Sequence, residues 1–250
     1  MTMANDSLEG KVLRDILERR YRLSSTPILD INHVLEVLER SFDGLAFCLS
    51  KKEDMLSQWR GYADDGMGFS IGFTEEFLRN TSWQDAIHFK DVVYDLKAQE
   101  ALLKPIFEIV EEAIRAQASS GSLGELLEGD VDGYEERLRA ESQISSFFSQ
   151  RFFDLAWSER FTLKHAAFQE EEESRLIHVL SAKTFPHVRF RPDRGKLMPY
   201  IENDIPNGVR AVESVFVGPK NTTPLYLIEE FLRQNLFTNV SVKKSESSYR

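Results

Sequence analysis

The feature that most constrains the fold is residues 48–73, where polar and glycine-containing sequence (CLSKKEDMLSQWRGYADDGMGFSIGF) separates two apolar segments. The apolar segments, residues 45–49 and 69–73, have the composition of β-strands. Between them, residues 53–62 fit one or two helical turns and residues 63–68 fit a turn. A tryptophan–arginine pair, a tyrosine, acids and glycines in such a connection make a poor core and are typical of a pocket.

The rest of the chain alternates between helical and strand-like periodicity. Apolar spacing predicts helices near residues 8–17, 32–40, 96–117, 124–158 and 223–235. Short β-prone segments predict further strands at residues 89–94, 174–180, 188–191, 198–201, 211–217 and 240–243. Strands on both sides of a two-helix insertion at residues 96–158 predict one α+β domain over residues 1–250, with a mixed, mostly antiparallel sheet.

Composition excludes several classes of protein. A chain of 250 residues with 42% hydrophobic content can bury a sizeable core, and a net charge of −10 argues against non-specific binding of nucleic acid or of anionic membranes. No apolar run approaches the about 20 residues that cross a bilayer, and we expect no leader peptide. The only cysteine, Cys48, indicates a reducing compartment. We therefore expect a cytoplasmic protein whose partner is a small molecule or another protein.

Trp59, Arg60 and Tyr62 form the first candidate site. A guanidinium beside aromatic rings can clamp a phosphate or carboxylate while the rings stack on a planar base. Alternatively, the two aromatic residues belong to the core and Arg60 pairs with a nearby acid. Gly66 and Gly68 allow positive φ and close approach of a ligand to the backbone, although the strand-to-helix context of a phosphate-binding loop is missing.

The acidic run at residues 170–175, EEEESR, is the second candidate site. In a strand, Glu171, Glu173 and Arg175 would project from one face. A carboxylate pair beside an arginine can polarise a ribose hydroxyl or stabilise an oxocarbenium-like centre. The alternative is a solvated acidic run ahead of an edge strand.

The remaining polar residues give weaker signals. The five histidines show no spacing typical of a zinc site and Cys48 has no second thiol, so we predict no metal site. Arg189, Arg191, Arg194 and Lys196 form a local basic cluster. This cluster can either receive an anion or neutralise the acidic run.

These motifs resemble a bacterial family known as domain of unknown function 2971. Residues 48–73 are similar to its central pattern, "CFS…LSQWRxYxxxGxGxxIGF", and residues 168–176 are similar to its strand "FxxExEWRL". Residues 189–191, 199–201 and 217–219 resemble its later sheet, and residues 240–250 resemble its closing motif, "VxxSxxPYR". In order, these segments span nearly the whole chain.

The chain departs from the family pattern at three places. Ser174 stands where the family usually has tryptophan, and Ser248 stands where it usually has proline. Residues 5–9, NDSLE, resemble a segment that many relatives place after an opening "HYT" strand and a helix. The resemblance therefore implies that this strand and helix are missing here.

The order of the family's motifs is similar to that of ADP-ribosyltransferase folds, which bind NAD. On this analogy, Ser50 and Tyr62 line the nicotinamide side and Arg60 contacts a phosphate. Glu173 and Glu171 hold the ribose and promote loss of nicotinamide. The predicted catalytic residues are thus Glu173, Glu171 and Tyr62, and the predicted ligand-binding residues are Ser50, Trp59, Arg60, Gly66, Gly68 and Arg175.

Two functions are consistent with these observations, and a third interpretation, motivated by Ser174 and the missing opening strand, is a structural copy decayed from an active ancestor. The first is a nucleotide-binding effector of the toxin or phage-defence type, which transfers ADP-ribose or cleaves NAD, with NAD as substrate. The second is a non-enzymatic ligand-sensing or protein-interaction domain, for which the acidic surface and the helical insertion offer a broad face. Side chains that converge on one cleft would favour the first, and side chains that point apart would favour the second.

Overall fold

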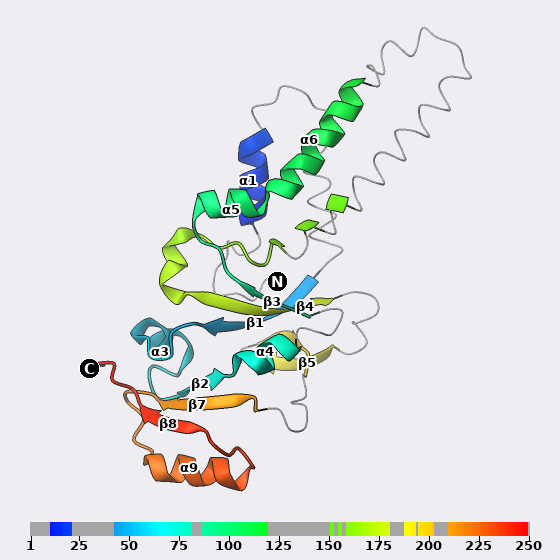
Figure 1. Cartoon of the computed structure of the whole chain (residues 1–250). Coiled ribbons are helices and arrows are strands. Elements are labelled where there is room, and N and C mark those ends of the chain that lie inside the picture. The colour runs from blue at the N-terminus through cyan, green and yellow to red at the C-terminus, as the bar shows by residue number, and fades with distance from the viewer. Residues whose placement is uncertain are drawn as a thin grey trace. The chain divides into compact units, whose positions relative to one another are not determined.

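The computed structural model describes residues 11–21, 43–81, 87–119, 151–152, 155–156, 159–180, 188–193, 195–202 and 210–249. The chain forms two compact units, one with residues 1–45, 92–168 and 179–186, the other with residues 46–91, 169–178 and 187–250 (Figure 1). The predicted helix at residues 32–40, and most of the one at 124–158, lie outside the described residues. None of the described helices is long and apolar enough to cross a membrane.

The first unit contains the helices α1 (Val12–Tyr21), α5 (Leu96–Leu102) and α6 (Lys104–Ser119). Leu13, Ile16 and Leu17 of α1 are buried in a cluster with residues of α6 such as Ile106, as expected for an amphipathic helix with apolar residues three and four positions apart. The predicted helix at 96–117 is two helices, α5 and α6. Pro105 explains the break, because proline fits the first turn of a helix but has no backbone N–H for its interior.

The second unit contains most of the strands. Its elements, some of which extend into the first unit, are β1 (Asp43–Ser50), α3 (Leu56–Tyr62), β2 (Phe69–Phe73), α4 (Glu75–Thr81), β3 (Ile87–Asp91), the 3-10 helix η1 (Ala166–Glu171), β4 (Glu173–Leu180), β5 (Arg189–Asp193), β6 (Lys196–Tyr200), β7 (Val212–Val217), α9 (Leu225–Gln234) and β8 (Ser241–Lys244).

These strands form three small sheets with the orders β1-β4-β3, β2-β7-β8 and β5-β6. The pairs β2–β7, β3–β4 and β5–β6 are antiparallel, and β7–β8 is parallel. The predicted α+β class with mostly antiparallel pairing is therefore confirmed. The prediction of one sheet is wrong for the described strands, which form three. β1 is an edge strand of the first sheet, and β2 is an edge strand of the second.

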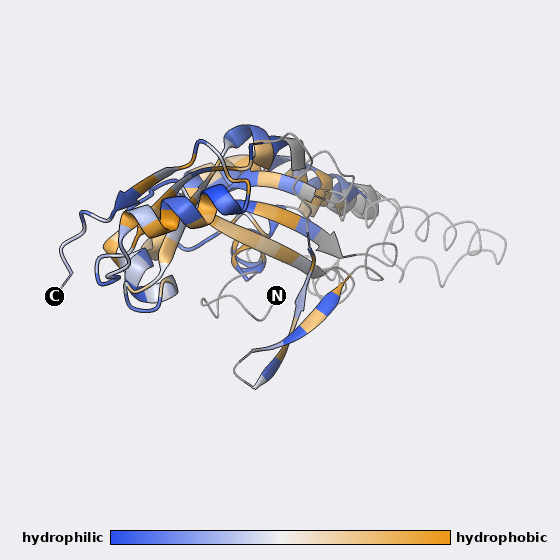
Figure 2. Cartoon of the chain, turned by 90° about the horizontal axis from the view of Figure 1, so that it is seen from below, coloured by the Kyte–Doolittle hydropathy of each residue, from blue (hydrophilic) through white to orange (hydrophobic). Residues whose placement is uncertain are grey.

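Helix α9 covers part of the second sheet. Its buried residue Ile228 packs in a cluster with Val215 and Val217 of β7. Leu225 and Leu232, which lie on the same side of the helix, extend this cluster. Figure 2 shows polar and apolar residues mixed along α9, as expected for a helix with one face on a sheet and the other in solvent.

The glycine turn after α3 is held against the turn after β7. The backbone N–H of Gly218 donates to the carbonyl of Gly68 at 3.0 Å, and that of Lys220 donates to the carbonyl of Gly66 at 3.1 Å. A Cβ atom at Gly218 would lie 2.3 Å from the carbonyl oxygen of Gly66. Gly66 has φ +85°, which L side chains rarely adopt. The glycines therefore serve this close approach of two backbones.

This contact predicts different costs for two glycine substitutions. Gly218→Ala should lower the free energy of unfolding by about 2 kcal/mol or more, because backbone atoms must move to admit the methyl group. Gly61→Ala, at a helical glycine with no other atom within 4 Å of the added Cβ, should leave stability unchanged or raise it by up to about 1 kcal/mol. Urea denaturation of both variants measures the difference, and equal effects would contradict the packing described.

Candidate functional site

A cavity of about 750 Å³ lies in the second unit beside β1, α3 and β2. Its size falls within the range of small-ligand sites. Its aromatic lining residues are Phe47, Trp59, Tyr62, Phe69, Phe73 and Phe89, and its hydroxyl-bearing ones are Ser50, Tyr62, Ser70, Ser174 and Ser214. The walls can thus pack against a flat or apolar group and offer a few polar contacts.

The cavity runs along the edges of two strands. β1 contributes the consecutive residues 47–50 and β2 contributes residues 69–73. A cavity on the face of a strand would be lined by alternate residues only, because successive side chains point to opposite faces. β1 leads into α3 and β2 leads away from it. The arrows of Figure 1 show that the two strands run in opposite directions.

Three of the predicted site residues line this cavity, namely Ser50, Trp59 and Tyr62. The Oγ of Ser50 donates to the carbonyl of Glu171 at 2.8 Å and accepts from the backbone N–H of Lys52 at 3.1 Å, so this hydroxyl already has two partners. Trp59 is buried, whereas the Tyr62 side chain is 59% exposed and accessible to a ligand.

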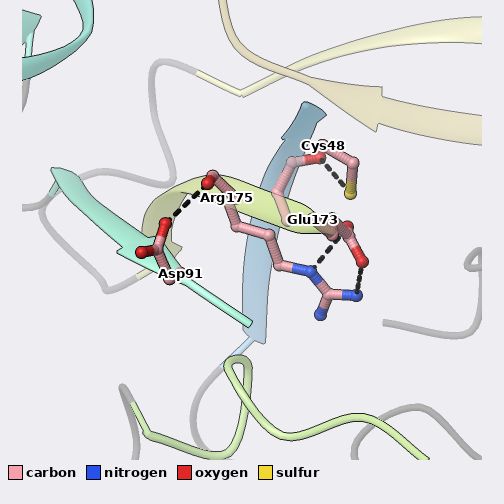
Figure 3. A network of polar contacts seen from close by, with 6 residues as sticks. Cys48, Asp91, Glu173 and Arg175 are labelled. Atoms are coloured by element: carbon pink, nitrogen blue, oxygen red, sulfur yellow. Dashed lines mark hydrogen bonds and ion pairs between the residues drawn. The ribbon is translucent and has the colours of Figure 1, made fainter. Parts of the chain in front are cut away.

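The predicted catalytic glutamate, Glu173, does not line the cavity. Both of its carboxylate oxygens accept hydrogen bonds from the Arg175 guanidinium, at 2.8 and 2.9 Å (Figure 3). Both side chains are buried, with exposed fractions of 6% and 1%. The prediction that Glu173 and Arg175 share a face of a strand is confirmed, and on that face the two residues form an ion pair with each other.

The other predicted residues also lie outside the cavity. Glu171 belongs to η1 and not to the strand, because Glu172 has φ +41° and interrupts the extended backbone. The Arg60 guanidinium lies 4.9 Å from the ring centroid of Tyr249, beside a shallower hollow that Glu170 also lines. Gly66 and Gly68 serve the turn contact described above. The predicted set is thus divided between several places.

Two lysines stand at the cavity wall, and each has an acidic partner. The Nζ of Lys51 lies 2.7 Å from an Asp91 oxygen, and the Nζ of Lys52 lies 2.7 Å from a Glu172 oxygen. Partial burial raises the pKa of Asp91, but hydrogen bonds from Lys51 and Ser174 outweigh this effect and lower it. These ion pairs leave little net charge from the lysines for an anionic ligand.

Asp54 was not predicted as a site residue, yet its carboxylate binds Trp59, which lines the cavity. Its carboxylate accepts from Trp59 Nε1 and from the Oγ of Ser245, both at 2.6 Å, from the backbone N–H of Glu246 at 2.8 Å, and from the Oγ of Ser247 at 3.0 Å. Partial burial raises the pKa of Asp54, but these four donors outweigh burial and the net shift is downward. The ionised carboxylate therefore ties α3 to the C-terminal residues.

Tyr249 adds a second contact between the same segments. Its ring centroid lies 3.7 Å from the Lys220 Nζ, and its hydroxyl donates to Asp65. Lys220 also pairs with Asp65 at 2.7 Å, and the pKa of Asp65 is lowered by the hydrogen bonds from Lys220 and Tyr249. The C-terminal residues 245–249 thus bind the outside of the segment that carries Trp59 and Tyr62.

The sequence signal for these missed residues is weak. Asp54 lies inside the central motif, and Ser245, Ser247 and Tyr249 lie inside the closing motif. Nothing in the sequence connects the two motifs, because 191 positions separate Asp54 from Ser245.

Within the described part of the chain, no group of three or more His, Cys, Asp or Glu residues is placed to hold a metal ion.

Fold and site together define an α+β protein with a ligand-sized cavity between two strand edges. Residues 58–176 match the family described as "Protein of unknown function (DUF2971)". This match confirms the resemblance read from the motifs. Neither a curated protein nor a solved structure matches the chain. The family description assigns no activity, so the geometry of the cavity must supply the functional argument.

The Asp54 contacts predict a pH-dependent loss of stability. Asp54→Asn should lower the free energy of unfolding by about 2 kcal/mol at neutral pH, since it removes the charge that four donors share. Because the pKa of Asp54 is lowered by folding, this contribution is present above the ordinary aspartate pKa of about 4 and is lost as the pH falls through the folded-state value. The difference between wild type and variant should therefore shrink on acidification.

Urea denaturation at pH values between about 7 and 3 measures this difference. Asp64→Asn is a matched control, because the Asp64 side chain is exposed and an asparagine accepts its φ of 47°. A gap between wild type and Asp54→Asn that stays constant across this pH range would contradict the role given to the carboxylate.

The buried pair predicts a strongly non-additive double substitution. Glu173→Leu alone should destabilise the protein by about 3 kcal/mol or more, because it leaves the Arg175 charge buried and without this partner. Adding Arg175→Met should restore much of the loss. Glu75→Gln, which breaks an exposed pair with Arg79, should cost less than about 1 kcal/mol. Additive losses in thermal or urea unfolding would argue against a structural pair.

Proposed function

We propose that the protein is a recognition domain that binds a ligand in the cavity between β1 and β2 without converting it chemically. The observation that carries this proposal is the separation of the predicted site. Ser50, Trp59 and Tyr62 line the cavity, whereas the Glu173 carboxylate is outside it and bound by Arg175. This is the arrangement expected of a binding module more than of a glycosyl-transfer centre, which needs a carboxylate at the ribose.

The surface of the cavity supports binding by apolar contact. Phe47, Tyr62 and Phe69 are 48%, 59% and 47% exposed, so a ligand can remove a large aromatic area from water. Each Å² of apolar area buried contributes about 25 cal/mol before the costs of association. Rings of this kind hold planar groups or apolar side chains. Polar contacts from Ser70 and Ser174 would then orient the ligand.

A second candidate is NAD binding with ADP-ribosyl transfer or NAD cleavage. It is favoured by the presence of Ser50 and Tyr62, both predicted for the nicotinamide side, in one cavity with Trp59. For this activity the Glu173 carboxylate would have to leave Arg175 and reach the ribose. The ion pair therefore weighs against this candidate, and a turnover assay separates the two.

The single cysteine gives a direct test of the recognition proposal. Cys48 is exposed and lines the cavity, so alkylation by iodoacetamide reports on access to it. The uncharged dye Nile red should bind the wild type with a rise in fluorescence and slow alkylation of Cys48. Ser70→Trp, which fills the cavity, should abolish both effects. Dye binding and protection that are the same in Ser70→Trp would show that the cavity is not the binding site.

The same preparation tests the second candidate. Incubation with NAD should release nicotinamide no faster than NAD in buffer alone, in the wild type and in Tyr62→Phe. Release by the wild type that is lost in Tyr62→Phe, with both proteins equally stable, would overturn the recognition proposal in favour of an NAD-using enzyme. Liquid chromatography of the supernatant measures the nicotinamide.

A further inference from the structure

We propose that the ligand of this cavity is an extended peptide segment, which pairs as an additional β-strand with the free edges of β1 and β2. This inference rests on the proposed function, because it names the class of ligand for the same cavity. The partner is therefore a protein that offers an exposed, extended stretch.

The hydrogen-bond pattern of β2 identifies the backbone N–H and C=O groups that point to its open edge. The bonds from Gly218 to Gly68 and from Lys220 to Gly66 fix which residues face β7. Because antiparallel residues alternate between facing the partner strand and facing away, Ser70 and Gly72 direct their N–H and C=O groups to β7. The register places them opposite Phe216 and Ser214. Phe69 and Ile71 then direct theirs to the open edge, which no described strand covers.

The opposite wall of the cavity offers a second edge. β1 pairs with β4 and, among the described residues, has no strand on its other side. β1 and β2 run in opposite directions (Figure 1), so an inserted strand would be antiparallel to one and parallel to the other. Its backbone N–H and C=O groups can be satisfied on both sides, which a small molecule can do at only a few positions.

The two edges lack the features that usually block strand addition. Natural edge strands carry prolines or charged side chains that prevent pairing with other chains. Residues 44–50 of β1 and 69–73 of β2, GLAFCLS and FSIGF, contain neither, and Asp43 at the start of β1 is the only charged residue in these two strands. By contrast, the isolated pair of β5 and β6 has Pro192 and Pro199, together with charged residues such as Arg191. The unprotected edges are thus those that border the cavity.

The walls also define the sequence of the peptide. Leu49, Phe73 and Phe89 belong to one apolar cluster, and all three line the cavity. Alternate residues of an inserted strand would face this cluster and should be apolar, with polar residues between them. The net charge of −10 disfavours an acidic peptide. Pairing along the five residues of β2 requires a stretch about 17 Å long.

Panning of a phage-displayed random-peptide library on the immobilised protein tests this proposal. Ser70→Trp is the matched counter-target, because its larger side chain fills the cavity while its backbone still pairs with β7. We expect wild type to enrich peptides with alternating apolar residues about tenfold or more over the variant. No enrichment over Ser70→Trp would overturn the proposal.

Amide exchange measured residue by residue by NMR then distinguishes strand addition from other modes of binding. A synthetic copy of the enriched peptide should slow exchange at Phe69 and Ile71 about tenfold or more, and leave Ser70 and Gly72, already paired with β7, nearly unchanged. N-methylation of alternate peptide amides should weaken binding about tenfold. Unchanged exchange at Phe69 and Ile71, or equal binding of the methylated peptide, would contradict backbone pairing.

The outcomes separate this inference from the proposed function. If the dye binds and Ser70→Trp abolishes its binding, but no peptide is enriched, the cavity is a recognition site for another ligand class and the peptide proposal falls. If the dye and the library both fail, the proposed function falls as well.

Discussion

The carboxylate of Asp54 is the interaction that ties α3, one wall of the cavity, to the C-terminal residues. It accepts hydrogen bonds from Trp59, which lies 2% exposed in the cavity wall, and from the C-terminal Ser245, Glu246 and Ser247. Helix α3 has only seven residues and no side-chain cap at its N-terminus, and a helix this short is not stable by itself. The Asp54 contacts supply the missing support. They also explain why the closing motif of the chain, far away in sequence, belongs to the same site.

The acidic run shows how correct local reasoning can still misplace a site. Alternation along a strand predicts that Glu173 and Arg175 share a face, and they do. What alternation cannot predict is whether that face is open to a ligand. Burial decides the outcome, because a buried carboxylate is stable only when it is paired, and Arg175 is the partner two residues away. Ser174 points to the other side, where its hydroxyl donates to Asp91 at 2.6 Å and it lines the cavity.

Local sequence predicted the elements of the second unit well and its assembly poorly. The strands at 69–73, 174–180 and 211–217 were predicted because these short segments are rich in β-prone residues. A β-bulge after Gly72 is the only irregularity in the β2–β7 register. The division into separate sheets was missed, since strand order depends on contacts between distant residues. The cavity follows from that division, because it requires β1 and β2 to end different sheets. Asp54 was missed for the same reason, since its partners lie near the other end of the chain.

Because β1 and β2 do not pair with each other, each leaves one strand edge without a described partner strand. Edge strands without charge or proline tend to pair with other chains, and both strands here expose large apolar side chains, Phe47 on β1 and Phe69 and Ile71 on β2. Closing the gap between them would satisfy the backbone groups but would also remove the cavity. Helix α3, which Asp54 and Tyr249 contact, lies within the connection between the strands, and three of its residues, Gln58, Trp59 and Tyr62, line the cavity. Edges that border a ligand-sized cavity and carry no proline and little charge are better explained by a partner strand than by incomplete folding.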